Sequence, residues 1–324
     1  MMLLVVFSMN TTSSASAAVA SHDAHGRFGI RLLEAPVVRR KDPRAYYQIV
    51  DHIAPGTTIH RRILVENAST RPLRVQLYAG AAQVLKHRFI PLIGRTPNEL
   101  TTWMSLDKPS LDLSPHGEGT ARVTIKVPPS ASRGERYGVV WAQAEALPDA
   151  RHNLGVINRV GVRTFLDVGP GGEPASDFQI TSLTPARRKD GSPEVLAQVR
   201  NSGGRVLEMG GALTLSDGPG KMKAGPFAAT LGTTLVPGDS APVSVVLDRR
   251  LPSGPWKARL TLQSGMIKRT VSATLTFPAV NDTAGSPIRL SSSRLTEGLM
   301  VGGAVPAVVL ALWLLRRYRP RRRS

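Results

Sequence analysis

The chain contains no cysteine, which excludes disulfide bonds, thiolate metal sites and a cysteine nucleophile. Its stability must therefore come from apolar cores. Helical patterning is also scarce, because no window upstream of residue 299 carries an apolar stripe with a period of 3.6 residues, apart from a short turn around residues 97–100. Acidic residues are few, with 23 Asp and Glu against 42 Lys and Arg, which gives a formal net charge of +19 at pH 7.

Catalytic, metal-binding and cofactor-binding motifs are absent as well. Ser105 and Lys108 have the S-x-x-K spacing of penicillin-binding enzymes, but Pro109 follows a strand-like segment and the companion motifs are missing. The seven histidines show no helical metal-binding spacing, and the glycines of residues 169–172 lack the pattern of a phosphate-binding loop. We therefore expect a protein that is not an enzyme and that needs no cofactor or metal.

Between residues 28 and 277 the sequence consists of short alternating or β-branched runs, separated by Gly, Pro, Asn and Asp about every ten residues. This pattern is typical of a β-sandwich. In the first half we expect strands at residues 28–35, 47–53, 58–66, 73–79, 102–106, 120–127, 136–144 and 156–168. In the second half we expect strands at residues 178–183, 194–200, 206–215, 227–235, 241–247, 255–263 and 267–277. The prediction is an all-β protein with two tandem immunoglobulin-like β-sandwich domains, residues 28–168 and 175–278.

The segments that join these regions have a different composition. Residues 169–174 contain three glycines and two prolines and are expected to form a linker. Residues 279–298 are polar and rich in turn formers, which predicts a flexible stalk. Both halves also share a short pattern in which an asparagine, Asn67 or Asn201, ends a strand and leads a turn. Asparagine suits this position because its side chain can bond its own backbone.

The first 20 residues are expected to be a signal peptide. Residues 1–9 are mostly apolar, and Ala18 and Ala20 give the small-x-small pattern of a cleavage site before Ser21. No Lys or Arg precedes Arg27, so the positively charged start of a signal peptide is missing. A disordered leader or a truncated signal peptide is the alternative.

An uncharged apolar run at residues 299–315 is followed by a basic tail at residues 316–324. As a helix this run is roughly 25 Å long, within the observed range of membrane spans, so we expect one transmembrane helix. Trp313 is the expected interfacial anchor, and Arg316, Arg317 and Arg319 predict a cytoplasmic tail with everything before the helix outside the cell. A sortase signal is the alternative, but its L-P-x-T-G sequence is missing.

Small residues in and before this run have a spacing that lets two helices approach closely: Gly298, Gly302, Gly303 and Ala307. Pairing with another helix is therefore one interpretation, and the abundance of small residues in membrane spans is the other. The sequence leaves the oligomeric state open.

The expected extracellular part is basic, with 36 Lys and Arg against 23 Asp and Glu once the six tail arginines are set aside. This charge favours anionic partners such as lipid headgroups, acidic glycans or wall polymers, unless it only reflects an arginine-rich composition. Nucleic acid is a poor partner for an exported chain. The candidate residues are Arg39, Arg40, Lys41, Arg61 and Arg62 for anionic polymer, and Trp103 and Tyr137 for stacking on sugars. Trp141 could also stack on a sugar if exposed, but its expected position is in the core.

Three stretches of the first half carry a recognisable strand pattern: Ile49-Val50-Asp51 followed by Pro55-Gly56, residues 63–69, and residues 134–142. With them the chain resembles, over about residues 28–168, the peptidoglycan-binding domain of WxL-interacting proteins. These are Gram-positive surface proteins with immunoglobulin-like domains, a C-terminal membrane helix and a basic tail. The resemblance implies attachment to peptidoglycan and a scaffold role for other surface proteins.

Two functions therefore follow from the sequence. The first is a non-catalytic, membrane-anchored cell-surface protein that binds peptidoglycan or an anionic wall polymer and scaffolds other surface proteins. The alternative is a chaperone-like or accessory protein that binds an exported protein by β-strand pairing, as pilus chaperones do. An enzyme that acts on wall polymers is the least favoured interpretation.

Overall fold

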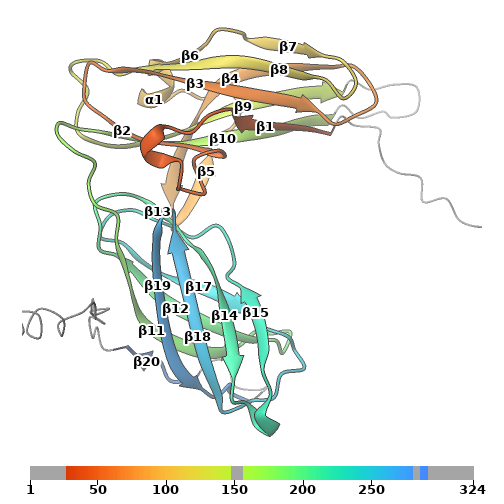
Figure 1. Ribbon diagram of the computed structural model, residues 1–324, viewed down its shortest axis with the longest axis vertical. Coiled ribbons are helices and arrows are strands. Elements are labelled where there is room, and N and C mark those ends of the chain that lie inside the picture. The colour runs from red at the N-terminus through yellow and green to blue at the C-terminus, as the bar shows by residue number, and fades with distance from the viewer. Residues whose placement is uncertain (1–26, 147–155, 280–284, 291–324) are drawn as a thin grey trace, which may run out of the picture.

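The computed structural model describes residues 27–146, 156–279 and 285–290 (Figure 1). The expected signal peptide, the apolar run of residues 299–315 with its small residues and Trp313, and the basic tail all lie outside these described residues. Within the described ranges, no helix is long and apolar enough to cross a membrane.

Residues 28–168 form two β-sheets. The first sheet has the order β1(Phe28–Leu32), β3(Thr58–Asn67), β8(Glu118–Lys126), β6(Met104–Leu106). The second has the order β2(Gln48–Ile53), β10(Val156–Val168), β9(Gly134–Ala146), β4(Leu73–Leu85), β5(Arg88–Pro91), and β7(Ser110–Leu113) also pairs with β4. Neighbouring strands are antiparallel, except that β2 runs parallel to β10. We call this part the N-terminal sandwich.

One apolar core lies between these two sheets. Ile63 and Val123 project into it from the first sheet, and Val75, Val140 and Leu166 project from the second. These side chains are at most 1% exposed, and burying a side chain of this size contributes about 1.5–3 kcal/mol. The sequence achieves this by placing an apolar residue at every second position of β8 and its neighbours, because strand side chains alternate between faces.

Residues 178–289 form a second set of sheets, which we call the C-terminal sandwich (Figure 1). One sheet has the order β17(Ser240–Val246), β12(Pro193–Asn201), β11(Phe178–Arg187), β20(Ile288–Arg289). The facing sheet has the order β15(Ala224–Ala228), β14(Gly210–Ser216), β18(Trp256–Ser264), β19(Ile267–Leu275), and β13(Leu207–Glu208) pairs with β16(Thr234–Leu235). Phe178, Val243, Trp256, Leu260 and Phe277 fill the core between them.

The prediction of an all-β protein built from β-sandwiches is confirmed. Some expected strands differ in detail. Residues 206–215 form two strands in different sheets, β13 and β14, since the chain changes sheet before Gly210; residues 227–235 are likewise split between β15 and β16. The sequence pattern also missed the short strands β5 and β7.

The expected strand at residues 102–106 begins as the last turn of a short helix, α1(Glu99–Trp103). The Asn98 side chain accepts the backbone N–H of Thr101, and the Thr101 hydroxyl accepts the backbone N–H of Asn98. This capping box satisfies two N–H groups that a helix start leaves unpaired. The turn noted around residues 97–100 is therefore the start of a helix.

Residues of the expected linker and stalk make contacts with the two sandwiches. Residues 169–174 form no strand, as expected of a linker, but Glu173 forms ion pairs with Arg39 and Arg205. In the expected stalk the structure describes residues 285–290, and here Ile288 pairs with Leu183 as part of β20. This short part of the expected stalk is therefore attached to the C-terminal sandwich.

The asparagine pattern has the same structure in both sandwiches. The Asn67 side chain donates to the carbonyls of Arg71 and Ser114 and accepts the N–H of Ser69, at 2.8, 2.9 and 3.0 Å. The Asn201 side chain donates to the carbonyls of Arg205 and Leu235 and accepts the N–H of Gly203, at 2.8, 3.0 and 3.0 Å. Both asparagines are fully buried. Each therefore fixes a strand end to a turn and to a third segment.

Candidate functional site

The contact between the two sandwiches contains a buried arginine, Arg205. It lies just before β13 and is 2% exposed. Its guanidinium forms an ion pair with Glu135 at 2.7 Å, a second with Glu173, and donates to the carbonyl of Asp51 at 3.4 Å. Glu135 and Asp51 belong to the N-terminal sandwich, so one side chain binds the two units and the linker together.

Apolar side chains complete this junction. Val50, Phe165 and Val206 form a small buried cluster, with Phe89 and Tyr137 packed against it. The Phe165 ring centroid lies 5.0 Å from that of Phe89 and 5.9 Å from that of Tyr137. These aromatic contacts add to the area that the junction removes from water.

The hairpin of β4 and β5 also reaches the C-terminal sandwich. The carbonyl of His87 accepts the N–H of Thr234 at 2.8 Å, and the His87 ring lies 2.9 Å from the carboxylate of Asp239. Arg163 of β10 and Gln48 of β2, both in the second sheet of the N-terminal sandwich, bind the carboxylate of Glu208 in β13 of the C-terminal sandwich. The junction therefore combines a buried ion pair and an apolar cluster with more exposed polar contacts around them.

Three of the cations expected to bind an anionic polymer are already paired. Arg39 binds Glu173, Arg61 binds the Asp51 carboxylate at 2.7 Å, and Arg62 binds Glu34 at 2.7 Å. Arg39 and Arg61 therefore contribute to the network around Arg205. Of this group, only Arg40 and Lys41 are exposed and have no acidic partner among the described residues.

The two aromatic candidates are also engaged. Trp103 lies under the guanidinium of Arg136, which is 4.9 Å from the ring centroid. Tyr137 packs at the junction, and its hydroxyl donates to Glu135 at 3.2 Å. Burial and the neighbouring Glu135 carboxylate raise the pKa of Tyr137 above its ordinary value. The structure does not bring the seven candidates together on one open face.

A strand edge of the N-terminal sandwich lacks a partner along part of its length. β10 pairs with β9 over residues 156–168, but on its other side β2 pairs only with residues 163–168. In the described part of the chain, no strand pairs with this side of residues 156–162. Alternate N–H and C=O groups of an edge point away from the sheet, so those on this side of residues 156–162 have no ladder partner, although β1 of the first sheet lies close to β10. Ile157 in this stretch is 54% exposed.

Trp141 lies beside this edge, on the outer face of the second sheet. The core side chains of β9 are Val140 and Ala142, so Trp141 has the opposite direction and the expectation of a core position is wrong. Its indole lies over two glycines, because a Cβ at Gly80 would be 2.7 Å from Nε1 and one at Gly161 would be 2.7 Å from Cε3. The glycines make room for a flat tryptophan on the neighbouring strands.

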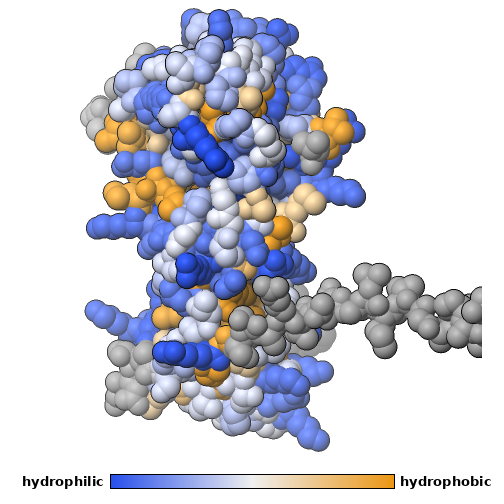
Figure 2. Space-filling view, turned by 90° about the vertical axis from the view of Figure 1, so that its left-hand side faces the viewer, coloured by the Kyte–Doolittle hydropathy of each residue, from blue (hydrophilic) through white to orange (hydrophobic). Residues whose placement is uncertain are grey.

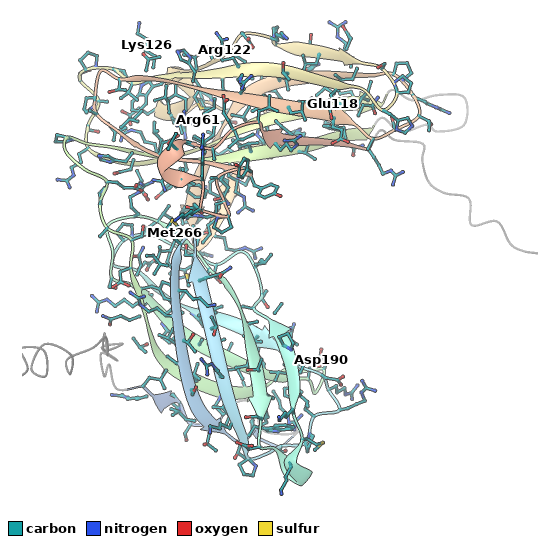
Figure 3. All side chains as sticks on the ribbon, in the orientation of Figure 1. Arg61, Glu118, Arg122, Lys126, Asp190 and Met266 are labelled. Atoms are coloured by element: carbon teal, nitrogen blue, oxygen red, sulfur yellow. The ribbon has the colours of Figure 1, made fainter. Side chains whose placement is uncertain are left out.

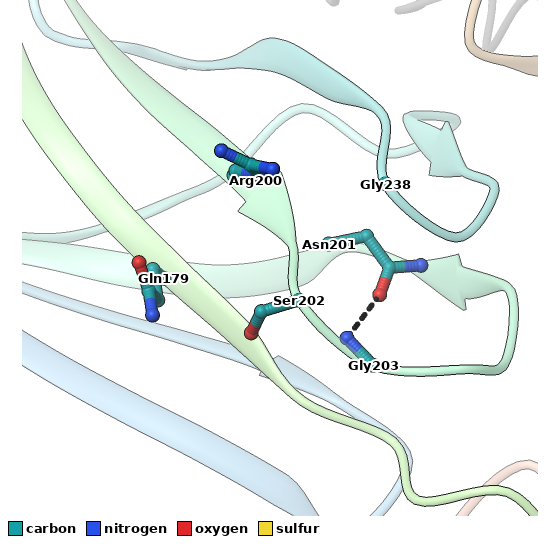
Figure 4. A pocket seen from close by; sticks show the side chains of 6 residues that line it. All are labelled: Gln179, Arg200, Asn201, Ser202, Gly203 and Gly238. Carbon is teal, nitrogen blue, oxygen red and sulfur yellow. Dashed lines mark hydrogen bonds between the residues drawn. The ribbon is translucent and has the colours of Figure 1, made fainter.

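A shallow polar pocket of about 390 Å³ opens on the C-terminal sandwich (Figure 4). It is lined by Gln179, Arg200, Asn201, Ser202, Gly203 and Gly238. The Asn201 oxygen accepts the N–H of Gly203 within it, so this side chain already serves the turn. No carboxylate, histidine or activated nucleophile lines this pocket.

A part-buried pair of His52 and Asp167 does not form a catalytic triad. His52 Nδ1 lies 2.6 Å from Asp167, and its Nε2 lies 3.2 Å from the carbonyl of Gly171, where a nucleophilic hydroxyl would be required. Ser105 is on β6, and the Lys108 ammonium donates to the carbonyl of Thr120. Among the residues with a described position, no three potential ligands group into a metal site.

Exposed apolar side chains are scattered, and include Val37, Tyr47, Ile93, Leu231 and Met266. Figure 2 shows a face that is mostly hydrophilic, with hydrophobic residues in small separate groups. Large contiguous apolar patches are the usual mark of a hydrophobic docking site. On this face, strand edges and polar grooves are therefore the surfaces to consider.

No protein-family model matches the sequence, and no curated protein matches it. Among solved structures, the chain is similar to the CupB2 chaperone of Pseudomonas aeruginosa, with 12% identity, a TM-score of 0.38, and coverage of 71% of this chain and 98% of the other. It is similar to the SafA pilin–SafB chaperone complex of Salmonella enterica, with 11% identity, a TM-score of 0.38, and coverage of 77% and 97%. It is also similar to the E. coli chaperone DraB, with 13% identity, a TM-score of 0.36, and coverage of 71% of this chain and 95% of the other. TM-scores below 0.5 do not establish a common fold.

Proposed function

We propose that the protein is a non-catalytic binding protein that holds an exported protein partner by β-strand pairing along residues 156–162 of β10. The observation that carries this proposal is the edge of β10, which β2 leaves unpaired before Arg163. A partner strand on this edge would gain main-chain hydrogen bonds, while side chains of alternate residues would select the partner. Ile157 and Arg159 are exposed there and are available for such contacts.

Another edge strand, β19, is less suited to this role. Arg269 has the same direction as the core residues Val271 and Leu275, but it is exposed and forms an ion pair with Asp177 at 2.6 Å. A charge that points inward on an edge strand discourages pairing with another chain. The described half-edge of β10 carries one charge, Arg159, which points to the outer face.

The junction supports the same proposal, because a binding edge works best on a rigid frame. The ion pairs of Arg205 and the Phe165 cluster hold the C-terminal sandwich against the sheet that contains β10. We propose that the partner is bound outside the cell, and that residues 1–20 and 299–315 provide export and membrane anchoring. Membership of the WxL-interacting family stays a prediction from the sequence.

The experiment is site-specific photo-crosslinking of the full chain in intact cells. A photoreactive residue at Ile157 or Arg159 is compared with one at Ser272, an exposed position on β19. We expect one defined protein adduct from both β10 positions and none from Ser272. The proposal fails if the β10 positions give no protein adduct, or if the same adducts form from Ser272.

Trp141 favours a second function, which is binding of wall glycan. An indole that lies flat over Gly80 and Gly161 on an outer sheet face could stack on a sugar ring. The test is sedimentation of the full chain with peptidoglycan sacculi across a salt series. Binding that survives salt and is lost in Trp141→Ala, but not in Trp103→Ala, would support this function, and an unchanged Trp141→Ala would remove it.

A further inference from the structure

One sheet of the C-terminal sandwich carries no acidic residue. Its four strands, β15, β14, β18 and β19, contain no Asp or Glu. The same strands contain four basic residues: Lys257, Arg259, Lys268 and Arg269. Lys257 and Arg269 pair with Asp217 and Asp177, which lie outside these strands, at 4.0 and 2.6 Å. Arg259 and Lys268 are left as the unpaired cations of the four strands, and unpaired charges of one sign attract counter-charged partners.

A groove of about 510 Å³ lies on the outer face of this sheet. Its lining residues are Gly211, Ala212, Thr214, Arg259, Thr261, Gln263 and Lys268. Gly211 and Ala212 are small, which hollows the face along β14. The side chains of Arg259 and Lys268 are exposed and have no hydrogen-bond or ion-pair partner among the described residues. Their charges are therefore available to a ligand.

The position of these cations favours an extended ligand. Lys268 is opposite Gln263 in the ladder, four residues along β18 from Arg259. At the usual rise of a strand this offset is roughly 13 Å. A linear polymer can contact both cations with their side chains extended outward, whereas a small single anion would require both long side chains to bend toward one point.

The rest of the groove distinguishes between classes of polyanion. Thr214, Thr261 and Gln263 supply hydroxyl and amide groups, and the hydroxyls of Thr261 and Thr270 lie 2.9 Å apart. The only aromatic residues of the four strands, Trp256 and Phe227, pack in or against the core. Single-stranded nucleic acid binds largely by stacking of bases on exposed aromatic rings, which this face lacks.

We infer that the outer face of β14, β18 and β19 binds a linear anionic glycan, a polymer whose phosphate, sulfate or carboxylate groups alternate with sugar or polyol hydroxyls. Arg259 and Lys268 contact two of its anionic groups. The threonines and Gln263 bond to hydroxyls between them, in the trough above Gly211 and Ala212. This site is in the other sandwich from the β10 edge and does not depend on the function proposed there.

The test measures binding of the full chain to dextran sulfate, with neutral dextran as the reference. Arg259→Ser with Lys268→Ser is compared with Arg122→Ser and Lys126→Ser, which remove two exposed cations from β8 of the N-terminal sandwich (Figure 3). Loss of two charge-assisted contacts lowers affinity about tenfold or more, whereas the control pair changes it less than about twofold. Neutral dextran does not bind.

A second variant, Ala212→Gln, fills the trough without changing charge. We expect it to weaken dextran sulfate binding as well, with an unchanged unfolding temperature. The inference is overturned if the β8 control weakens binding as much as the groove variant, because binding then reflects overall charge. It is equally overturned if neither groove variant has an effect, or if oligo-dT binds more tightly than dextran sulfate with the same dependence on Arg259 and Lys268.

Discussion

Arg205 and Glu135 form an ion pair of 2.7 Å across the junction of the two sandwiches, with 2% and 7% of their side chains exposed. The Glu135 carboxylate also accepts the backbone N–H of Val206 at 3.0 Å. Removing one partner of a buried pair leaves the other charge desolvated, which costs far more than the pair itself contributes. The junction therefore depends on both side chains together.

Arg205→Ala should lower the free energy of unfolding by about 3–5 kcal/mol, because Glu135 then stays buried without its counter-charge. The check is chemical denaturation of the full chain, with small-angle X-ray scattering to detect a change in the separation of the two sandwiches. Arg250→Ala is the matched control, since Arg250 pairs with Asp248 at 2.8 Å but is 89% exposed. We expect Arg250→Ala to leave the free energy of unfolding unchanged. Equal losses of stability in Arg205→Ala and Arg250→Ala would contradict the role of Arg205 at the junction.

The Tyr137 phenol should ionise later than the other tyrosines when pH is raised. Burial and the Glu135 carboxylate raise its pKa in the folded protein above the ordinary value near 10. The folded state then holds this proton more tightly than the unfolded state, so the free energy of unfolding should fall as pH rises above about 10. Absorbance at 295 nm reports the ionisation, and Tyr137→Phe should remove the late step and flatten the alkaline loss of stability. A Tyr137→Phe curve identical to that of the unchanged protein would refute the prediction.

Asn201→Ala and Asn67→Ala should each destabilise the protein by about 2–4 kcal/mol, because each fully buried side chain makes three hydrogen bonds to backbone groups. Urea denaturation measures the loss. The two sites are in different sandwiches and share no partner, so the double variant should show the sum of the single effects. Ser202→Ala, at the exposed residue next to Asn201, is the control and should have little effect.

The parts of the fold that are local in sequence could be predicted. β18 alternates buried and exposed residues from Trp256 to Ser264, and this period of two identifies a strand with one face in a core. The turns that follow Asn67 and Asn201 could also be predicted, because each asparagine side chain accepts an N–H only two residues further along the chain. The two splits, at β13 and β14 and at β15 and β16, could not, since a change of sheet leaves the apolar pattern unbroken.

The junction could not be predicted from the sequence. Arg205 and Glu135 are 70 residues apart, and in the sequence their charges do not differ from those of solvent-exposed residues. For that reason the sequence predicts Arg39 and Arg61 as polymer-binding cations, whereas the structure pairs them with acidic residues near the junction. A tryptophan on a strand of a sandwich is usually a core residue, which is the basis for expecting Trp141 there. Both faces of β9 carry apolar residues at this point, so the pattern shows no period that would reveal the outward direction.

Gly80→Ala should destabilise the protein through Trp141 alone. A Cβ at Gly80 would lie 2.7 Å from Nε1 and 2.8 Å from Cδ1 of the indole, and the next nearest atom, the Gly94 carbonyl oxygen, is 3.4 Å away. Overpacking of this kind costs about 1–3 kcal/mol. In the Trp141→Ala background the same substitution should be nearly neutral, so a double-mutant cycle by urea denaturation should show a coupling energy as large as the cost of overpacking.

Gly29→Ala is the control, because a Cβ there meets no atom within 4 Å. Additive effects of Gly80→Ala and Trp141→Ala would mean that the indole does not lie over this glycine, and the basis for stacking of a sugar on Trp141 would be lost with it.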